Sequence, residues 1–492
     1  MFLKNTLVLI TTALLLASCG RTVTVTQIDI IPEPVFLVQK EGAYTLNRNI
    51  AVATSGLGQN SPTAKYIMNS LRHGHLRPSL VSRTEESDIE LILNDTINPE
   101  LGDEGYLLEV RQTGIRLSAN TEVGLFYAYQ TLRQMIPADV LEHSYSSITL
   151  PECTVLDHPR FAWRGAHLDA SHHYFPVKFI KKFLDLMSFY KLNRFNWQLA
   201  DEETPVLPLP GGYDIISDTT DSIVDESKSS AGYTEEEIAE VVAYAASLGI
   251  TVVPEEGTDM VWDDENGVTR PGEILKRIVA ARTTLQAGHH AARTGNRVVM
   301  CPEEFCRLDY YQADPRYQPL AEEGLITLAK AYQFDPAPQG TNKYVEQCIV
   351  GGQSLLFTES IDNPAQAEYM LLPRLLAISE CLWTPRETKN WSRFRKKVEI
   401  QKARLASKGY NYCEGSFTPL FRATRVDDRT MNIAIETEVP STYIFYTTDS
   451  TTPTRQSQIY LGPINLRRGT HIKILPVYKD QERDSVYEFV IK

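Results

Sequence analysis

The sequence has little concentrated positive charge and few cysteines, and each shortage excludes a class of protein. Its 492 residues carry a formal net charge of −13, and the longest basic cluster lies within Phe394–Lys397. Nucleic acid is therefore not an expected partner, because phosphate binding needs concentrated positive charge. The cysteines are scattered, so they do not form the disulfide framework of a small domain. Cys301 and Cys306 have no histidine at ligand spacing, and we expect neither a metal nor a cofactor.

A long hydrophobic run is also missing, except near the amino terminus. There Lys4 precedes a mostly apolar stretch, Leu7–Leu16, which is too short to span a membrane comfortably. Small residues then lead to Cys19, which looks like a bacterial lipoprotein cleavage site. Residues 1–19 are therefore predicted to be a lipoprotein signal peptide, with Cys19 lipidated. A plain signal peptide is the alternative, and we expect a protein lipid-anchored to the bacterial cell envelope, either periplasmic or on the cell surface.

Residues 20–158 are predicted to form an α+β domain. Strand-like runs at Ile89–Leu93, Tyr106–Val110 and Gly114–Ala119 are separated by turn residues. Gly124–Ile136 has apolar residues at helical spacing and is the one clear helix of this part.

The middle of the chain, residues 159–412, alternates strands with amphipathic helices. The strand-like runs that end in acids or polar groups are AHLDAS, RFNWQLADE, ITVVPEE, VVMCPEE and LLFTES. Such units predict an α/β fold, a (β/α)8-type TIM barrel with functional groups at the carboxyl ends of its strands. Residues 205–232 look like a polar loop, so the barrel is predicted to be incomplete by one unit. Residues 416–492 are predicted to form a C-terminal β-sandwich.

A short link inside the barrel region indicates where the unit is missing. Ile250–Glu256 and Met260–Trp262 are two strand-like runs separated by only a few residues. A crossover between parallel strands needs about a dozen residues and usually includes a helix. If both runs lie parallel in one sheet, this link is too short, and we expect a connecting unit to be absent.

Nearly the whole chain resembles glycoside hydrolase family 20, the β-N-acetylhexosaminidases. For the catalytic barrel the resemblance lies in PRFAWRGAHLDASHHYFPVKFIKKFLDLMSFYKLNRFNWQLADE, GYTEEEIAEVVAYAASLGITVVPE, GNRVVMCPEEFCRLDYYQ and YMLLPRLLAISECLWTP. For the N-terminal domain it lies in IIPEP and GLFYAYQTLRQ, and for the chitobiase-type C-terminal module in YIFYTTDSTTPTRQSQIYLGPI. The resemblance implies a protein of glycan metabolism that recognises a terminal β-linked N-acetylhexosamine or a related sugar.

In that family the 2-acetamido oxygen of the sugar attacks the anomeric carbon, assisted by an Asp-Glu pair on the fourth strand. The Asp orients the acetamide, and the Glu protonates the leaving oxygen. The pair belongs to a strand that reads H-x-G-G-D-E, between the family's VVPE and GWDE strands. No H-x-G-G-D-E occurs in this chain, where Pro254-Glu255 runs almost directly into Trp262-Asp263. The missing unit therefore resembles the one that would have carried the catalytic acids.

The resemblance implies that a sugar-binding part of the site remains. Arg164 matches the family arginine that binds the ring hydroxyls of the terminal sugar, and the alternative is a structural ion pair with Asp169 or another barrel acid. Asp309 and Glu359 match family acids that accept hydrogen bonds from sugar hydroxyls. Asp201 matches a strand-end acid of the second unit. Taken alone, Asp309 and Glu359 would more often be solvated charges at strand ends, and Asp201 could equally be a purely structural acid.

Other positions depart from the family pattern around the acetamide. Aromatic side chains enclose that group in the family, and Trp262 is what remains of them here. The departures are Ser171-His172-His173 for SRH, Asn196-Trp197-Gln198 for HWH, Arg282 and Phe357 for two tryptophans, and Arg307 for the tyrosine that holds the acetamide oxygen. Without aromatic walls, the charge that develops on the acetamide is less shielded from water.

Three hypotheses follow for function. The first, which we favour, is a family member with impaired or lost hydrolysis that binds a glycan or serves as a scaffold. The second is an active enzyme with a surrogate acid among Glu255, Glu256, Asp263 and Asp264, although solvated loop charge is the simpler account of these residues. The third is an internal deletion in this sequence, with an intact parent elsewhere.

Overall fold

The computed structural model describes residues 22–58, 60–73, 76–137, 147–200, 233–256, 261–262, 278–440, 442–478, 481–482 and 486–491. The predicted signal peptide, with Cys19, lies outside these ranges, as do Asp201, Asp263 and Asp264. Within them, no helix is both long enough and apolar enough to cross a bilayer. The six cysteines within these ranges are free thiols, and five of them are buried, so the expected absence of a disulfide framework is confirmed.

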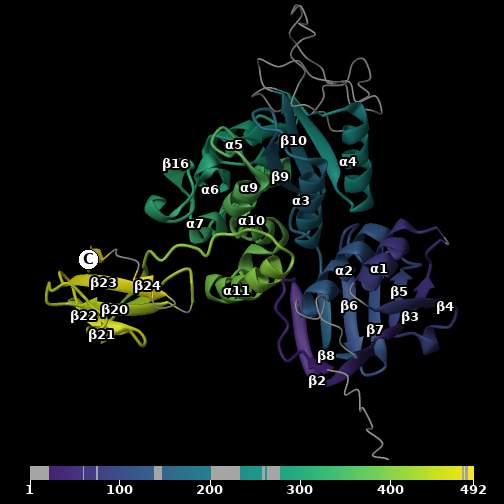
Figure 1. Ribbon diagram of the computed structural model, residues 1–492, viewed down its shortest axis with the longest axis horizontal. Coiled ribbons are helices and arrows are strands. Elements are labelled where there is room, and N and C mark those ends of the chain that lie inside the picture. The colour runs from purple at the N-terminus through teal and green to yellow at the C-terminus, as the bar shows by residue number, and fades with distance from the viewer. Residues whose placement is uncertain are drawn as a thin grey trace, which may run out of the picture.

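The amino-terminal domain is a mixed β-sheet covered by two helices (Figure 1). Its strands follow the order β1-β8-β6-β7-β5-β3-β4, with β2 also paired to β8. The strands are β1 (Thr22–Thr24), β2 (Phe36–Asn47), β3 (Asn49–Ser55), β4 (Arg77–Val81), β5 (Ile89–Leu93), β6 (Tyr106–Arg111), β7 (Gly114–Ala119) and β8 (Ser147–Asp157). The three predicted strands are β5, β6 and β7.

The two helices of this domain are α1 (Pro62–His73) and α2 (Glu122–Met135). The predicted helix is α2, which begins where the Thr121 side chain accepts a hydrogen bond from the Gly124 N–H. The expectation of one helix was wrong, because α1 also forms. Its buried residues, which include Ile67 and Leu71, recur at helical spacing.

The barrel region contains a seven-stranded sheet with the order β11-β10-β9-β17-β14-β13-β12. Its strands are β9 (Trp163–Asp169), β10 (Arg194–Ala200), β11 (Thr251–Glu256), β12 (Val261–Trp262), β13 (Ile278–Ala281), β14 (Arg297–Met300) and β17 (Ile349–Ser354). All neighbours pair in parallel except β12, which runs antiparallel to β13. The predicted incomplete parallel barrel is therefore confirmed.

The two edge strands show where the barrel is open. β11 and β12 stand at opposite ends of the strand order, and no pairing between the described residues joins them. Only four residues separate Glu256 from Val261, so the Cα atoms of these two residues are at most about 18 Å apart. The sheet must therefore curl until its edges nearly meet, because one missing strand leaves a gap of roughly 10 Å.

Two expectations about strands in this region were wrong. Leu355–Ser360 was predicted as a strand, but β17 ends at Ser354 and these residues follow its carboxyl end. The run at Met260–Trp262 was considered as a parallel strand, whereas β12 is antiparallel to its neighbour. A chain that leaves β11 and re-enters the sheet after four residues has no room for the crossover that a parallel strand requires.

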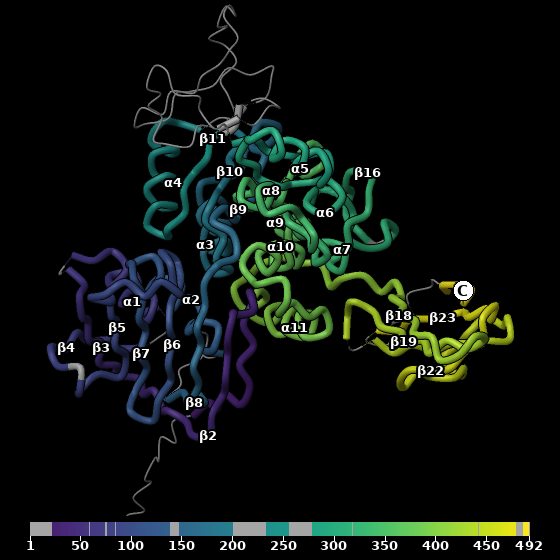
Figure 2. The backbone as a smooth tube through the Cα atoms, turned by 180° about the vertical axis from the view of Figure 1, so that it is seen from behind, coloured from purple at the N-terminus to yellow at the C-terminus, as the bar shows by residue number. Residues whose placement is uncertain are grey.

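Helices cover the outside of this sheet (Figures 1 and 2). They are α3 (Val177–Phe189), α4 (Glu235–Ser247), α5 (Leu285–Arg293), α6 (Glu303–Cys306), α7 (Leu328–Tyr332), α8 (Lys343–Cys348), α9 (Pro364–Leu371), α10 (Arg374–Trp383) and α11 (Trp391–Ser407). A small parallel pair, β15 (Tyr310–Tyr311) and β16 (Glu322–Leu325), lies outside the main sheet. α4 starts with a capping box, in which Thr234 and Glu237 each bond the backbone of the other.

The amino-terminal domain is joined to the start of the barrel by buried polar groups. Lys191, in the turn before β10, places its Nζ 2.8 Å from the Asp157 carboxylate at the end of β8, and both side chains are inaccessible to solvent. Trp383, from α10, donates its ring N–H to the other oxygen of Asp157 at 2.9 Å. Paired polar groups therefore connect the domain to the barrel. The apolar residues of both also belong to one continuous hydrophobic core.

The carboxyl-terminal module has two antiparallel sheets and a core of its own. The strands are β18 (Leu420–Arg425), β19 (Thr430–Glu436), β20 (Tyr443–Thr447), β21 (Gln458–Ile459), β22 (Ile464–Arg467), β23 (His471–Tyr478), β24 (Gln481–Glu482) and β25 (Tyr487–Val490). Ile433 of one sheet and Ile444 and Ile474 of the other belong to one buried cluster. The module is therefore a small sandwich.

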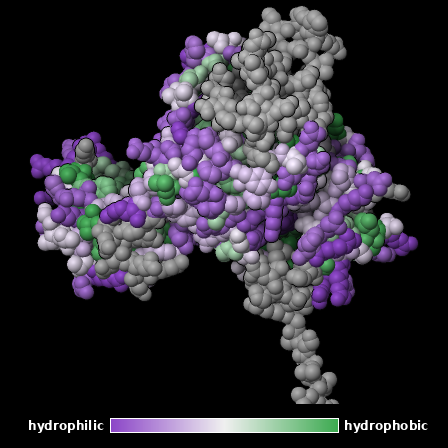
Figure 3. All heavy atoms as spheres, turned by 45° about the horizontal axis from the view of Figure 1, so that its top comes forward, coloured by the Kyte–Doolittle hydropathy of each residue, from purple (hydrophilic) through white to green (hydrophobic). Residues whose placement is uncertain are grey.

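Among the residues coloured in Figure 3, the visible surface is largely hydrophilic, and the hydrophobic residues are scattered over it. Exposed large apolar residues such as Ile97 and Leu461 come from different domains. Scattered exposed apolar residues are normal for folded proteins. The functional site is therefore to be sought among polar groups at the ends of the barrel strands.

Candidate functional site

Polar side chains gather at the carboxyl ends of the barrel strands. β9 ends at Asp169, β13 is followed by Arg282, and Asp309 comes after β14 and the short helix α6. Glu359 comes five residues after the end of β17. Since the carboxyl ends of parallel strands meet on one face of a barrel, these residues form one candidate site.

Asp309 is the most perturbed acid of this site. Its side chain is 1 % exposed, and one oxygen accepts a hydrogen bond from Nε of Arg307 at 2.9 Å. No described group donates a hydrogen bond to its other oxygen, Oδ1, which is also buried. Burial raises the pKa of Asp309 to about 6, although Arg307 opposes the shift. A buried, half-satisfied carboxylate is costly unless a ligand completes its hydrogen bonds.

Two arginines and a histidine surround the ring of Phe357. The guanidinium carbons of Arg282 and Arg307 lie 5.5 and 5.1 Å from the ring centroid. The imidazole of His167 lies 5.2 Å from the same centroid on a tilted plane. His167 accepts a hydrogen bond from the Leu356 N–H through Nδ1, so Nε2 is the atom that donates to Gln198 at 3.0 Å. The candidate site therefore contains cations where the family pattern has aromatic rings.

A second polar cluster lies at the end of β9. Asp169 accepts hydrogen bonds from the Ser171 hydroxyl at 2.6 Å and from the His172 ring at 2.7 Å. Ligand atoms of Asp169, His172 and Glu359 lie within 4.8 Å of one another. Such a group could hold a cation, but the hydrogen bonds from Ser171 and His172 already account for the charge of Asp169. Glu359 remains exposed and is available to a ligand.

The prediction that Arg164 binds the sugar was wrong. Arg164 lies at the start of β9 and is inaccessible to solvent. Its two terminal nitrogens pair with the carboxylate oxygens of Glu104 at 2.8 and 2.9 Å, and its remaining donors reach Lys191 O, Phe161 O and the Tyr127 hydroxyl. With all five N–H donors satisfied, the side chain has none left for a ligand. Arg164 therefore forms a structural ion pair, as the alternative supposed, but not with a barrel acid.

The partner of Arg164 was also unexpected. The alternative hypothesis named Asp169 or another barrel acid, but Glu104 comes from the amino-terminal domain. Burial, the largest single influence, raises the pKa of Glu104, but the Arg164 charge and the hydrogen bonds from Arg164 and Asn193 together outweigh it, and the net pKa shift is downward. Arg164 thus holds two domains together at the amino ends of the strands.

The other predicted site residues cannot be placed as side chains. Asp201 lies outside the described residues, and of Trp262 only the backbone is described, paired with Ile278 at the sheet edge. Glu255 and Glu256 are described as backbone of β11, where they pair with Gln198 and Ala200. Of the predicted substrate residues, the structure therefore brings together Asp309 and Glu359.

Sequence reasoning noted four further site residues as departures from a pattern, but did not assign them to the site. They are His172, Arg282, Arg307 and Phe357. The signal that could have found them was position, because each lies within three residues after the end of a strand or of a strand-end helix. What these groups can do chemically is bind hydroxyls and negative charge, through carboxylate acceptors and arginine donors.

Comparisons with known proteins agree with this architecture. Residues 161–260 and 256–386 match the catalytic domain of glycosyl hydrolase family 20, residues 27–158 match domain 2 of that family, and residues 433–491 match an Fn3-associated module. The catalytic match comes in two pieces, which meet where β11 is followed by β12. That break coincides with the opening in the sheet.

Relatives and solved structures lead to the same family. A β-hexosaminidase of Porphyromonas gingivalis is 25% identical over 579 residues, covering 92% of this chain and 73% of that protein. A β-N-acetylhexosaminidase of Cellulomonas fimi is 25% identical over 476 residues, covering 75% of this chain and 93% of that protein. The first alignment is longer than this chain, so that relative contains segments that this chain lacks.

The fold is likewise that of a solved N-acetyl-β-hexosaminidase. The Streptomyces plicatus enzyme, determined in complex with Thio-NAglucal, superimposes with a TM-score of 0.64 at 22% identity, over 79% of this chain and 97% of that chain. A likeness at this identity establishes the fold. Together with the matched catalytic domain and domain 2, it places the chain in glycoside hydrolase family 20, as a β-N-acetylhexosaminidase-like protein.

Proposed function

We propose that this protein is a lipid-anchored member of family 20 that recognises a terminal β-linked N-acetylhexosamine or a related sugar, with hydrolysis impaired or lost. The observation that carries the proposal is the coincidence of three breaks. The H-x-G-G-D-E motif is absent from the sequence, the sheet is open between β11 and β12, and the catalytic-domain match divides at residues 256–260. All three fall where the family places its Asp-Glu pair.

Sugar recognition is supported by the acids that remain. Asp309 has a buried oxygen without a hydrogen-bond donor, and Glu359 is exposed beside it. Sugar hydroxyls are donors of the kind that such carboxylates accept. Losing the general acid alone costs about 10²–10⁴-fold in rate, so binding can persist where turnover does not.

The deciding experiment is an assay of the purified protein with a chromogenic β-linked N-acetylglucosaminide, run beside a calorimetric titration with N-acetylglucosamine. We expect saturable binding of the sugar and turnover about 10²-fold or more below ordinary enzymatic rates. Ordinary turnover that disappears when Glu255, Glu256, Asp263 or Asp264 is replaced by its amide would instead establish an active enzyme with a surrogate acid. Absence of both binding and turnover would leave the scaffold hypothesis.

The lipid anchor needs a separate test, because it rests on the amino-terminal sequence alone. In a bacterial host that processes lipoproteins, the protein is expected in the membrane fraction. Replacing Cys19 by serine should release it to the soluble fraction, because two hydrophobic acyl chains would no longer hold it to the bilayer. A Cys19→Ser protein that still partitions with the membrane would contradict lipidation at this residue.

A further inference from the structure

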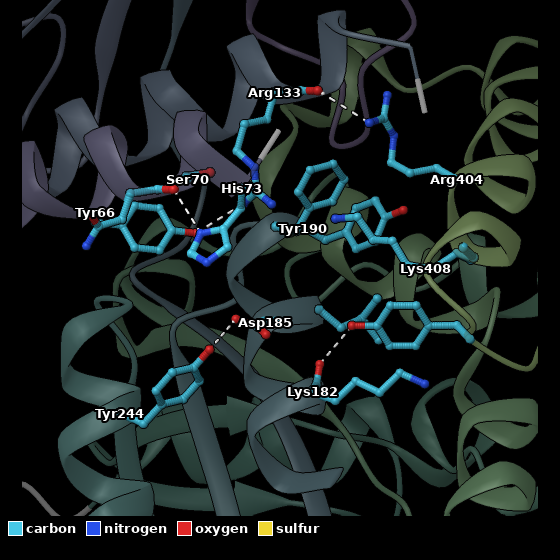
Figure 4. Close-up of a pocket in the computed structure, with 15 residues that line it drawn as sticks. Tyr66, Ser70, His73, Arg133, Lys182, Asp185, Tyr190, Tyr244, Arg404 and Lys408 are labelled. Atoms are coloured by element: carbon cyan, nitrogen blue, oxygen red, sulfur yellow. Dashed lines mark hydrogen bonds between the residues drawn. The ribbon is translucent and has the colours of Figure 1, made fainter. Parts of the chain in front are cut away.

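A cleft of about 540 Å³ lies between the amino-terminal domain and the amino end of the barrel. Figure 4 shows that its walls come from α1 and α2 on one side and from α3, α4 and α11 on the other. α3 leads away from the carboxyl end of β9, so the end of α3 lies at the opposite face of the barrel from the sugar site. The cleft is therefore separate from that site.

Three cations of this cleft gather around a single aromatic ring, that of Phe189. The guanidinium carbons of Arg133 and Arg404 lie 5.0 and 5.4 Å from the ring centroid, and Nζ of Lys408 lies 4.7 Å from it. The ring attracts each cation, but like charges this close repel one another. Desolvation, together with the Arg133 and Arg404 charges, lowers the pKa of Lys408 to about 7.

Opposite charge is scarce in the cleft. Of the described residues that line it, Asp185 is the one acid, and it accepts a hydrogen bond from the Tyr244 hydroxyl at 2.7 Å. A fourth cation, Lys182, is already paired with Glu368 at 2.5 Å. The positive charge around Phe189 therefore exceeds the negative charge that faces it, even though a pKa of about 7 leaves Lys408 only partly protonated at neutral pH.

Structural roles account for only part of this charge. Arg404 donates to the carbonyls of Gln134 and Ile136, which close the end of α2. Its Nε is buried, however, and finds no acceptor among the described residues. Arg133 bonds the Tyr66 hydroxyl and the Gln130 side chain through one of its nitrogens.

Lys408 has even less of a structural role. Its side chain lines the cleft, and no described atom forms a hydrogen bond with its Nζ. An ammonium group held near two guanidinium groups, with donors to spare, is poorly explained as packing alone. A bound anion would supply both the missing charge and the missing acceptors.

We propose that this cleft binds a tetrahedral oxyanion, the phosphate or sulfate group of a small molecule, held by Lys408 and Arg133 beside the charge of Arg404. Four tyrosines, Tyr66, Tyr190, Tyr244 and Tyr410, line the space around the cations. The site does not depend on the sugar site or on hydrolysis. It lies between two domains, so an occupied cleft also ties them together.

The test uses the whole protein and two probes, inorganic phosphate and sulfate, at constant ionic strength set with sodium chloride. Calorimetric titration should show saturable binding of at least one probe, and the melting temperature should rise with that probe beyond the chloride control. Lys408→Gln should weaken the Kd about tenfold, as expected for losing one charge-assisted hydrogen bond, and Lys408→Arg should retain most of the affinity.

Lys396→Gln is the matched control, because Lys396 is exposed on α11, the helix that ends just before Lys408, and does not line the cleft. It should change the Kd by less than about twofold, since exposed charges act weakly at a distance in salt. Arg133→Gln provides a second variant with the same expected weakening as Lys408→Gln. No saturable binding of either probe, or equal weakening by the Lys396 and Lys408 variants, would overturn the proposal.

Two further ligands identify the source of the anion. A hexose 6-phosphate that binds more tightly than inorganic phosphate would assign the site to a phosphorylated sugar, whereas equal affinity would assign it to the free ion. A neutral hexose should not bind in the cleft, so Lys408→Gln should leave any affinity of the protein for it unchanged. Neutral-hexose binding that Lys408→Gln weakens as much as it weakens phosphate binding would contradict an oxyanion site.

Discussion

The polar side chains at the two ends of β9 differ in how completely their hydrogen bonds are satisfied. At the amino end, Arg164 is buried, and every donor it has meets an acceptor. At the carboxyl end, Asp169 and its neighbours border a site in which Glu359 is exposed and Asp309 keeps a buried oxygen without a donor. Satisfied polar groups at one end of a barrel contribute stability, and unsatisfied ones at the other end are available for binding.

The largest effect expected from this comparison is on folding. Arg164→Ala leaves Glu104 without its partner, and breaking a buried ion pair in this way costs about 3–5 kcal/mol in the free energy of unfolding. Chemical denaturation at neutral pH measures the loss. Arg111→Ala, which removes a half-exposed pair with Glu109, is the control and should cost less than about 1 kcal/mol.

The pH dependence of this pair has a definite sign. Because the folded pKa of Glu104 is lowered, its contribution to stability is complete above its unfolded pKa and is lost as the pH falls through the folded value. The difference in stability between wild type and Arg164→Ala should therefore shrink in acid. If the Arg164→Ala protein folds with unchanged stability but binds sugar more weakly, Arg164 is a sugar-binding residue and not a structural one.

A smaller effect, of opposite sign, is expected at Asp309. Its folded pKa, about 6, lies above the ordinary value of 3.8, so folding is weakened as the pH rises from about 4 to about 6. Asp309→Asn removes that penalty but also loses the charge on the hydrogen bond from Arg307. We expect a net gain of about 1 kcal/mol at pH 7.5 and none at pH 4.

Denaturation curves at these two pH values test the prediction. A stabilising substitution at this buried charge would indicate that the carboxylate serves binding rather than folding. If Asp309→Asn destabilises the protein at pH 7.5, the Asp309 carboxylate contributes to folding as Arg164 does. The proposed difference between the two ends of the barrel strands would then be wrong.

The smallest effect on folding is expected at Glu359. Its side chain is exposed, so Glu359→Gln should change the free energy of unfolding by less than about 0.5 kcal/mol. Its affinity for N-acetylglucosamine should nevertheless fall about tenfold, through the loss of a charged acceptor. Glu323→Gln, at another exposed acid, is the control, and equal calorimetric affinities for both variants would exclude Glu359 from the site.

Strands and helices with a clear period could be predicted from the sequence. Ile89–Leu93 and Gly114–Ala119 are strands at the predicted bounds, because side chains alternate between buried and half-buried faces. Leu355–Ser360 has an equally apolar start but lies beyond β17, since the sheet register, not composition, decides where pairing ends.

The site could be predicted only in part, for a similar reason. Asp309 and Glu359 were found because the LDYYQ and LLFTES segments that contain them resemble segments of the family, and such a resemblance is visible in a sequence. The role of Arg164 was not, because its partner Glu104 is 60 residues away, in another domain. The residues next to Arg164 in the sequence do not show which distant side chain it contacts in the folded protein.

The sequence by itself determined the family resemblance, the order of the domains and the absence of the H-x-G-G-D-E unit, because these depend on which residues are present and in what order. Only the tertiary structure decided that Arg164 joins two domains, that Asp309 is half-satisfied, and that Arg133, Arg404 and Lys408 surround one ring. Burial and the meeting of distant charges set these energies, and both arise only when the chain is folded.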